Sequence, residues 1–273
     1  MQNSSNSNSI STELGSLHYV QYGSGPKKLL VFHGFGQDHT IAVQLLKVLQ
    51  DDYTIFSFDL PYHGKSDWSE TECLITKENI RELFSGWLKE NSILEFSVLG
   101  YSMGGKFALS ISEQFVKQIE HCILIAPDGL YKSPWYRMAI SFPIKTLFRH
   151  IIHHPGLFLG ITWFVSKTRL VSLKLMQFAT SQMTTDKQRK QVYYTWVNFQ
   201  KLYTSKQQLQ KLVDENELQL NVILGDKDSV ISPKTIVPIV DGIKDINVTI
   251  LPIGHGRLFS ESIPLLSDLM KEE

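Results

Sequence analysis

Short apolar runs alternate with longer amphipathic segments from Leu14 to about Ala126, and the alternation resumes near Leu218. The short runs are rich in β-branched and aromatic residues and predict strands at 17–22, 28–32, 54–58, 96–99, 121–126, 220–224 and 247–251. Most of them are almost continuously apolar, as strands buried on both faces are. The pattern therefore predicts an α/β fold with a doubly wound, mostly parallel sheet covered by helices.

The strand pattern disappears between residues 130 and 213, where helical signals replace it. Ser133 followed by Pro134 is typical of a helix N-terminus, and Thr185 with Gln188 three positions later fits a capping box. The segment leaves the sheet after one strand and returns before the next. It is predicted to be a helical lid, residues 130–213, inserted into a core made of residues 13–129 and 214–273.

The first residues of the chain and its most apolar stretch indicate where in the cell the protein is expected. Residues 1–12 are polar and predict a disordered tail, without the basic and apolar regions of a secretory signal. The apolar stretch 156–165 is much shorter than the roughly 20 residues that a membrane-spanning helix needs. We therefore expect a cytoplasmic protein with no integral membrane association.

Composition narrows the class of protein without changing the fold. The 273 residues include 27 lysines and arginines against 27 aspartates and glutamates, and 42% of them are apolar. This balance is typical of a soluble globular protein and gives no reason to expect a nucleic-acid partner. Cys122 lies in an apolar run far from Cys73, so we expect a buried free thiol rather than a disulfide.

The strand at 96–99 runs directly into Gly100-Tyr101-Ser102-Met103-Gly104-Gly105, and a helical pattern follows. Strand, sharp turn and helix form the context in which a Gly-x-Ser-x-Gly motif presents a nucleophile. The glycines are needed because side chains two positions from Ser102 would collide where strand and helix approach each other. We predict Ser102 as the nucleophile.

Two backbone N–H groups are candidates for stabilising an oxyanion. Met103 stands at the start of the helix after the elbow, where the helix dipole assists its N–H. The second candidate is the N–H of Phe35, in the loop His33-Gly34-Phe35-Gly36 after an earlier strand.

Taken together, four features in this chain order resemble the α/β-hydrolase superfamily, in its serine-nucleophile, lidded, esterase- or lipase-like form. They are His33-Gly34 after a strand, the Gly-x-Ser-x-Gly elbow, a late Gly-x-x-Asp and a final Gly-His. The resemblance also covers Asp59-Leu60-Pro61-Tyr62-His63-Gly64-Lys65-Ser66, which is similar to a structural turn of the family, with Tyr62 where glycine is usual. It implies a bracing role for His33.

The resemblance also implies the base and the acid. His255 follows the last predicted strand, where the superfamily places its base, and Asp228 matches the Gly-x-x-Asp position. Asp128 also follows a strand, and some members take their acid from that place, so it remains the alternative. The order Ser102, Asp228, His255 is the one expected of this architecture.

No metal, flavin or nucleotide cofactor is expected. His150, His153 and His154 lie close together, but no carboxylate or cysteine accompanies them at ligand spacing. His18 and His39 have no sequence neighbour that suggests chemistry. The predicted activity is hydrolysis of a carboxylic ester with a small to medium hydrophobic acyl or alcohol group, through an acyl-enzyme.

Other functions fit the same sequence features. The catalytic set also suits thioester, amide or carbon–carbon bond hydrolysis, a lyase reaction or perhydrolysis. A ligand receptor or signalling protein on a hydrolase scaffold is an alternative of another class, and the stretch 156–165 leaves open a peripheral membrane lipase.

Overall fold

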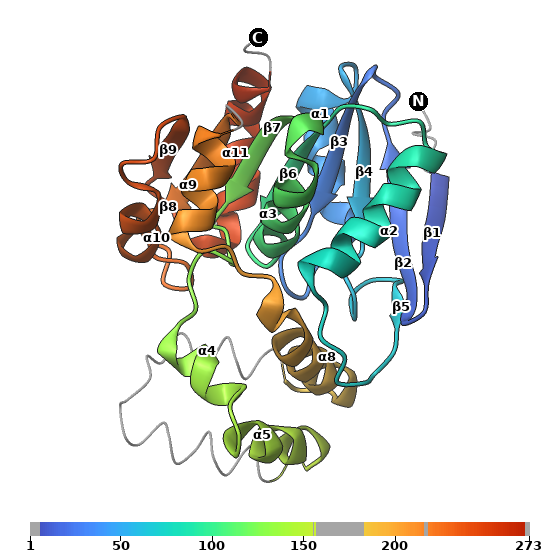
Figure 1. Ribbon diagram of the computed structural model, residues 1–273, viewed down its shortest axis with the longest axis vertical. Helices are drawn as coiled ribbons and strands as arrows, with labels where there is room; N and C mark the ends of the chain where they lie inside the picture. The colour runs from blue at the N-terminus through green and yellow to red at the C-terminus, as the bar shows by residue number, and fades with distance from the viewer. Residues whose placement is uncertain (1–5, 155, 157–182, 216–217, 271–273) are drawn as a thin grey trace. The chain divides into compact units, whose positions relative to one another are not determined.

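The chain forms two compact units in the computed structural model, which describes residues 6–154, 156, 183–215 and 218–270 (Figure 1). The first unit comprises Met1–Ser69, Ile75–Tyr131 and Lys201–Glu273. The second comprises Glu70–Leu74 and Lys132–Gln200.

The described strands of the first unit form one sheet in the order β1-β2-β4-β3-β6-β7-β8-β9, with β5 paired to β2. Pairing is parallel from β4 to β9 and antiparallel among β1, β2, β4 and β5, so the predicted doubly wound, mostly parallel sheet is confirmed. The strands are β1 (Asn6–Thr12), β2 (Gly15–Tyr22), β3 (Lys27–Phe32), β4 (Tyr53–Phe58), β5 (Asp67–Trp68), β6 (Phe96–Tyr101), β7 (Ile119–Ile125), β8 (Leu220–Gly225) and β9 (Ile246–Leu251).

Helices cover both faces of this sheet because both faces of its central strands are apolar. The helices of the first unit are η1 (His39–Leu45), α1 (Leu46–Leu49), α2 (Lys77–Glu90), α3 (Gly104–Phe115), η2 (Val116–Gln118), α9 (Lys206–Asp214), α10 (Pro233–Val240) and α11 (His255–Leu269). On one face the ring of Phe32 lies 5.9 Å from that of Phe84 in α2 and 6.1 Å from that of Phe107 in α3. On the other face, Val31 belongs to a hydrophobic cluster that includes Leu258 of α11.

Strand β1 corrects the prediction of a disordered tail over residues 1–12, because Asn6–Thr12 pair with β2 in an antiparallel hairpin. The strand has little apolar content for a pattern to detect. It is held by main-chain pairing, which does not depend on side-chain type, and by a 2.8 Å hydrogen bond between Ser7 Oγ and His18 Nε2.

The described secondary structure of the second unit is helical, with α4 (Pro134–Ala139), α5 (Ile144–His153) and α8 (Asp186–Asn198), and η3 (Phe199–Lys201) crosses its boundary. Ser133 caps α4 and Thr185 forms the predicted capping box with Gln188. The apolar stretch 156–165 falls, apart from Gly156, outside the described residues.

The boundaries of the second unit differ from the predicted lid, residues 130–213. Helix α9 belongs to the first unit, where Leu209 and Val213 are buried, and the chain rejoins that unit through a 2.9 Å hydrogen bond from Thr204 N–H to Gly129 O. The segment Glu70–Leu74 joins the second unit because Glu72 pairs with Lys145.

Candidate active site

Ser102 occupies the sharp turn between β6 and α3 and has a φ of 50°, in the left-handed region that ordinary residues rarely adopt. A Cβ added to Gly100 would lie 2.7 Å from the Ala108 side chain, and one added to Gly104 would lie 2.0 Å from Phe32 O. These distances account for both glycines of the motif, since no side chain fits at either position.

Two further strand ends bring polar side chains to this turn. His255 is the first residue of α11, after β9, and its Nε2 lies 3.0 Å from Ser102 Oγ. Its Nδ1 lies 2.6 Å from Asp228 Oδ2, in the loop after β8. The carboxyl ends of parallel strands meet at one edge of the sheet, which is where open α/β sheets hold their sites.

Asp228 is held in place by the backbone of its own loop. Its Oδ1 accepts hydrogen bonds of 2.7 Å from Val230 N–H and 2.8 Å from Ile231 N–H, which leaves Oδ2 to accept from His255. With the carboxylate ionised, His255 carries its proton on Nδ1 and its Nε2 accepts from the Ser102 hydroxyl. This arrangement can move the proton of Ser102 to the imidazole.

Asp128, the alternative acid, makes other contacts. Its carboxylate pairs with the buried Lys106 ammonium at 2.9 Å and accepts a 2.7 Å hydrogen bond from Gly129 N–H. Its own N–H donates to Ser102 O at 2.8 Å. The backbone of Asp128 thus supports the turn of Ser102, while its carboxylate is engaged by Lys106.

The two predicted oxyanion donors come from segments that meet at the elbow. Met103 directly precedes α3, whose N-terminal end carries a partial positive charge. The loop that holds Phe35 starts where β3 ends, and the space at Gly104 is filled by the carbonyl oxygens of Phe32 and His33. Met103 is therefore adjacent to Ser102 in the chain, and the loop of Phe35 begins at backbone that packs against Gly104.

His33 braces the loop before Phe35 through both ring nitrogens. Its Nδ1 donates to Gly34 O at 2.7 Å, and its Nε2 accepts from Leu60 N–H at 3.0 Å. Burial lowers the pKa of this imidazole, which keeps it neutral and able to accept through Nε2. His63 is also buried, and its Nδ1 lies 3.0 Å from Pro61 O.

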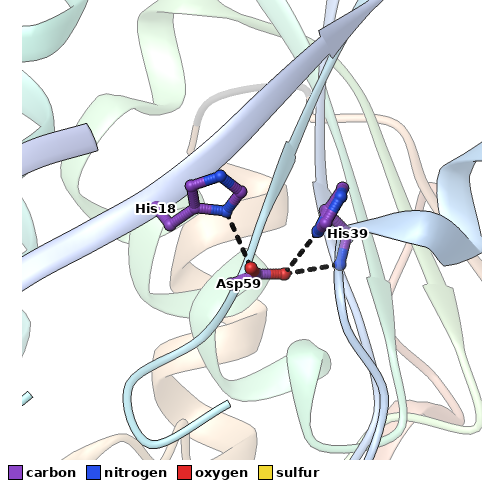
Figure 2. A group of neighbouring side chains, drawn as sticks. All are labelled: His18, His39 and Asp59. Atoms are coloured by element: carbon purple, nitrogen blue, oxygen red, sulfur yellow. Dashed lines mark hydrogen bonds and ion pairs between the residues drawn. The ribbon is translucent and has the colours of Figure 1, made fainter. Parts of the chain in front are cut away.

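A cluster that the sequence pattern did not indicate surrounds Asp59, at the end of β4 (Figure 2). Its Oδ2 lies 2.7 Å from His18 Nδ1 and accepts from Lys65 N–H at 2.8 Å. Its Oδ1 lies 3.0 Å from His39 Nδ1 and accepts from His39 N–H at 2.6 Å.

In the part of the chain that the structure describes, the Asp59 cluster brings histidine and acidic side chains together at a spacing that could suit a metal ion. All four acceptor positions of the carboxylate are filled by N–H donors, which makes the cluster a hydrogen-bond centre joining three segments of the chain. Burial raises the pKa of Asp59, but the hydrogen bonds from Lys65 and His39 outweigh it and leave the pKa below its usual value.

His150, His154 and Cys122 have contacts of their own, and the side chain of His153 lies outside the part that the structure describes. The rings of His150 and His154 stack at 4.1 Å in the second unit, and His154 Nδ1 lies 3.1 Å from His150 O. Cys122 is a buried free thiol, as predicted, and burial raises its pKa to about 12.

Tyr101 is a site residue that the motif did not reveal. Its hydroxyl donates to His255 O at 2.8 Å, and its ring is stacked on the His255 imidazole. The sequence places Tyr101 at a variable position of Gly-x-Ser-x-Gly, so only the fold shows this contact.

Comparison with known proteins gives the family of this chain. A family model described as alpha/beta hydrolase fold matches residues 27–261. The chain belongs to the alpha/beta hydrolase fold family. This α/β hydrolase is 29% identical over 117 residues to the uncharacterized hydrolase YugF of Bacillus subtilis, a match that covers 42% of each chain.

In the described residues, no helix has the length and apolar character needed to cross a membrane.

Two further comparisons involve esterases. The α/β hydrolase is 29% identical over 121 residues to a pimeloyl-[acyl-carrier protein] methyl ester esterase of Vibrio campbellii, covering 44% of each chain. These curated relatives are therefore matched over less than half their length. A solved esterase from Thermogutta terrifontis shares the fold over 97% of both chains, with a TM-score of 0.69 and 15% identity.

Proposed function

We propose that this α/β hydrolase cleaves carboxylic esters through an acyl-enzyme, with Ser102 as nucleophile, His255 as base and Asp228 as the orienting acid. The observation that carries the proposal is the hydrogen-bonded chain from Ser102 Oγ through His255 to Asp228, at 3.0 and 2.6 Å. The esterase named among its curated relatives supports ester hydrolysis as the reaction.

In the first half of the reaction, Ser102 Oγ attacks the ester carbonyl as its proton passes to His255 Nε2. The carbonyl oxygen becomes an oxyanion, and the N–H groups of Phe35 and Met103 donate to it, each contributing on the order of 3 kcal/mol. His255 then gives its proton to the leaving alcohol, and the acyl group stays on Ser102.

In the second half, water attacks the acyl carbonyl while His255 takes one of its protons. The tetrahedral intermediate collapses, the acid leaves, and the proton returns from His255 to Ser102 Oγ. Asp228 stabilises the imidazolium in both halves and keeps its Nδ1–H directed at the carboxylate, because Val230 and Ile231 hold that carboxylate in one orientation.

We further propose that the second unit acts as the lid and supplies the apolar surface for the acyl or alcohol group. The support comes from connectivity, since the chain enters this unit directly after Tyr131, three residues beyond Asp128, whose N–H binds Ser102 O. A small to medium hydrophobic substrate suits its aromatic side chains, of which Phe148 and Trp196 pack at 6.0 Å.

The experiment is a panel of p-nitrophenyl esters from acetate to dodecanoate, measured with the whole chain. We expect turnover with a preference for short to medium acyl groups, abolished in Ser102→Ala. Ser260→Ala is the matched control, because Ser260 is exposed on α11 and its hydroxyl donates to Arg257 O. Absence of Ser102-dependent turnover on every ester would refute ester hydrolysis.

The same variants separate the related reactions. Thioester, anilide and 1,3-diketone substrates test thioester, amide and carbon–carbon bond hydrolysis, and peracid formation from acetate and peroxide tests perhydrolysis. If the kcat/KM for one of these substrates exceeded that of the best ester by more than about 100-fold, its class would replace esters as the proposed substrate class.

A further inference from the structure

Tyr101 directly precedes the nucleophile in the chain and contacts the base, His255. It is the last residue of β6 and directly precedes Ser102. Its hydroxyl donates to the carbonyl oxygen of His255 at 2.8 Å, and its ring stacks on the imidazole with a centroid distance of 5.5 Å and an interplanar angle of 26°. One side chain thus contacts both the main chain and the ring of His255.

The phenol ring is itself held in one position. Tyr101 is 4% exposed, and its ring centroid lies 5.5 Å from that of Phe259, one turn along α11 from His255. On another side it faces Gly34, where an added Cβ would lie 3.1 Å from Tyr101 Cδ1 and Cε1. Gly34 directly precedes Phe35, so Tyr101 packs between the proposed oxyanion loop and the helix that carries the base.

We propose that Tyr101 is a positioning residue that holds the His255 imidazole in the orientation directing Nε2 at Ser102 Oγ, an inference that rests on the function proposed above. The Asp228 bond holds one end of the imidazole but still permits the ring to rotate about that contact. Tyr101 removes this freedom, because its hydroxyl fixes the backbone from which the side chain extends and its ring stacks against the imidazole.

The chemistry of a phenol suits this position. Burial, together with the nearby Asp228 carboxylate, raises the pKa of Tyr101 to about 12, so the hydroxyl remains a neutral donor to His255 O at ordinary pH. The ring face also attracts the imidazolium that forms during proton transfer, as aromatic faces attract cations. The contact is therefore stronger when His255 is charged than when it is neutral.

Two substitutions separate the hydroxyl from the ring. Tyr101→Phe keeps the stacking and removes the donor to His255 O, whereas Tyr101→Leu removes both. We expect the rate of fluorophosphonate labelling of Ser102 to fall roughly 3–10-fold in Tyr101→Phe and roughly 10–100-fold in Tyr101→Leu. With an ester substrate, kcat should fall in the same order while KM changes less than about 2-fold.

Tyr53→Phe is the matched control. Tyr53 is also a buried tyrosine, its hydroxyl donates to a backbone carbonyl, that of Met270, at 3.1 Å, and it stands at the amino end of β4, away from the edge that holds Ser102. Thermal unfolding of all variants measures the general cost of a lost buried hydrogen bond. Labelling should fall in the Tyr101 variants and stay at the wild-type rate in Tyr53→Phe.

Proton NMR of the His255 Nδ1–H resonance gives a second measurement that loss of stability alone would not change. The resonance should be sharp in the wild type, remain in Tyr101→Phe, and broaden or vanish in a folded Tyr101→Leu protein. If Tyr101→Phe and Tyr101→Leu were both labelled at the wild-type rate, the positioning role would be overturned and the hydrolase function would be left intact. A wild-type protein that does not label at all would overturn both.

Discussion

Asp228 and Asp128 both follow a strand, and their neighbours give them different roles. The Asp228 carboxylate accepts from His255 Nδ1, whereas the Asp128 carboxylate is paired with Lys106 Nζ. An acid that orients the base must keep its negative charge directed at the imidazole. The contacts therefore favour Asp228, and the choice between the two can be tested by one substitution at each position.

Asp228→Asn should lower kcat by about 10³- to 10⁴-fold, because a neutral amide no longer stabilises the imidazolium and favours the wrong tautomer of His255. Asp128→Asn keeps the size of the side chain and should leave kcat within about 5-fold of the wild type. The measurement is ester turnover under saturating substrate. If Asp128→Asn caused the larger loss, the acid would have been assigned to the wrong residue.

Asp59 should matter for stability and not for chemistry. Its pKa is held below the usual value, so its ionised form stabilises the fold above the unfolded-state pKa of about 3.9, and this contribution is lost as the pH falls through the folded-state pKa. Asp59→Asn should lower Tm by roughly 5–10 °C at pH 7. The difference from the wild type should shrink below about pH 4; a difference that grows there would contradict this sign.

Single residues also show what sequence reasoning can reach. Ser102 was predicted from a local pattern, the strand, turn and helix around Gly-x-Ser-x-Gly, whereas His255 was predicted from the family resemblance, which places a base after the last strand. The contact of Tyr101 with His255 and the approach of His18 and His39 to Asp59 join segments far apart in the chain. Such contacts follow from tertiary packing and leave no local pattern.

At the scale of elements, the turn between β6 and α3 depends on the absence of side chains. Gly104→Ala would place a Cβ 2.0 Å from the backbone oxygen of Phe32, so strand and helix would have to separate. We expect a loss of at least about 3 kcal/mol, seen as a fall in Tm of roughly 10 °C or as insoluble protein.

Gly86 provides the matched control for that substitution. It lies on the exposed side of α2, and an added Cβ would meet nothing within 4 Å. Gly86→Ala should therefore stabilise the protein by roughly 0.5–1 kcal/mol, because alanine loses less backbone entropy on forming a helix. Equal destabilisation by the two substitutions would show that close packing is not the reason for Gly104.

The strands were predictable to the extent that their sequences are apolar or β-branched. β3, β4, β6, β7 and β8 are mainly apolar and mostly buried strands in the centre of the sheet, and each was predicted to within a few residues at either end. β1 is a polar edge strand and β5 has two residues, so neither has an apolar pattern. Both exist because β2 offers them backbone hydrogen-bonding groups.

At the scale of the whole molecule, the division into two units was predictable, but its boundaries were not. The change from strand to helical patterns near residue 130 marks the insertion. The assignment of Glu70–Leu74 to the second unit depends on Glu72, which pairs with Lys145 and accepts from the Tyr193 hydroxyl, and on Asn198 Nδ2, which donates to Thr71 O at 2.8 Å. These partners are distant in sequence.

Glu72→Gln should weaken this attachment without affecting catalysis. The side-chain hydrogen bonds from Lys145 and Tyr193 lower the pKa of Glu72, so the carboxylate is charged at neutral pH and its loss removes the ion pair. Amides of residues 70–74 should exchange with deuterium faster, by roughly 5-fold or more. Glu78→Gln, which breaks only the exposed pair with Arg81 on α2, should leave their exchange unchanged.

The most direct test of the central claim is to locate the residue that reacts with a fluorophosphonate. The wild-type protein should gain one adduct, found by peptide mass spectrometry on Ser102, and Ser102→Ala should gain none. His255→Ala should react at least about 10³-fold more slowly, because the hydroxyl then lacks its base. An adduct on another serine, or labelling that persists in Ser102→Ala, would contradict the proposed nucleophile.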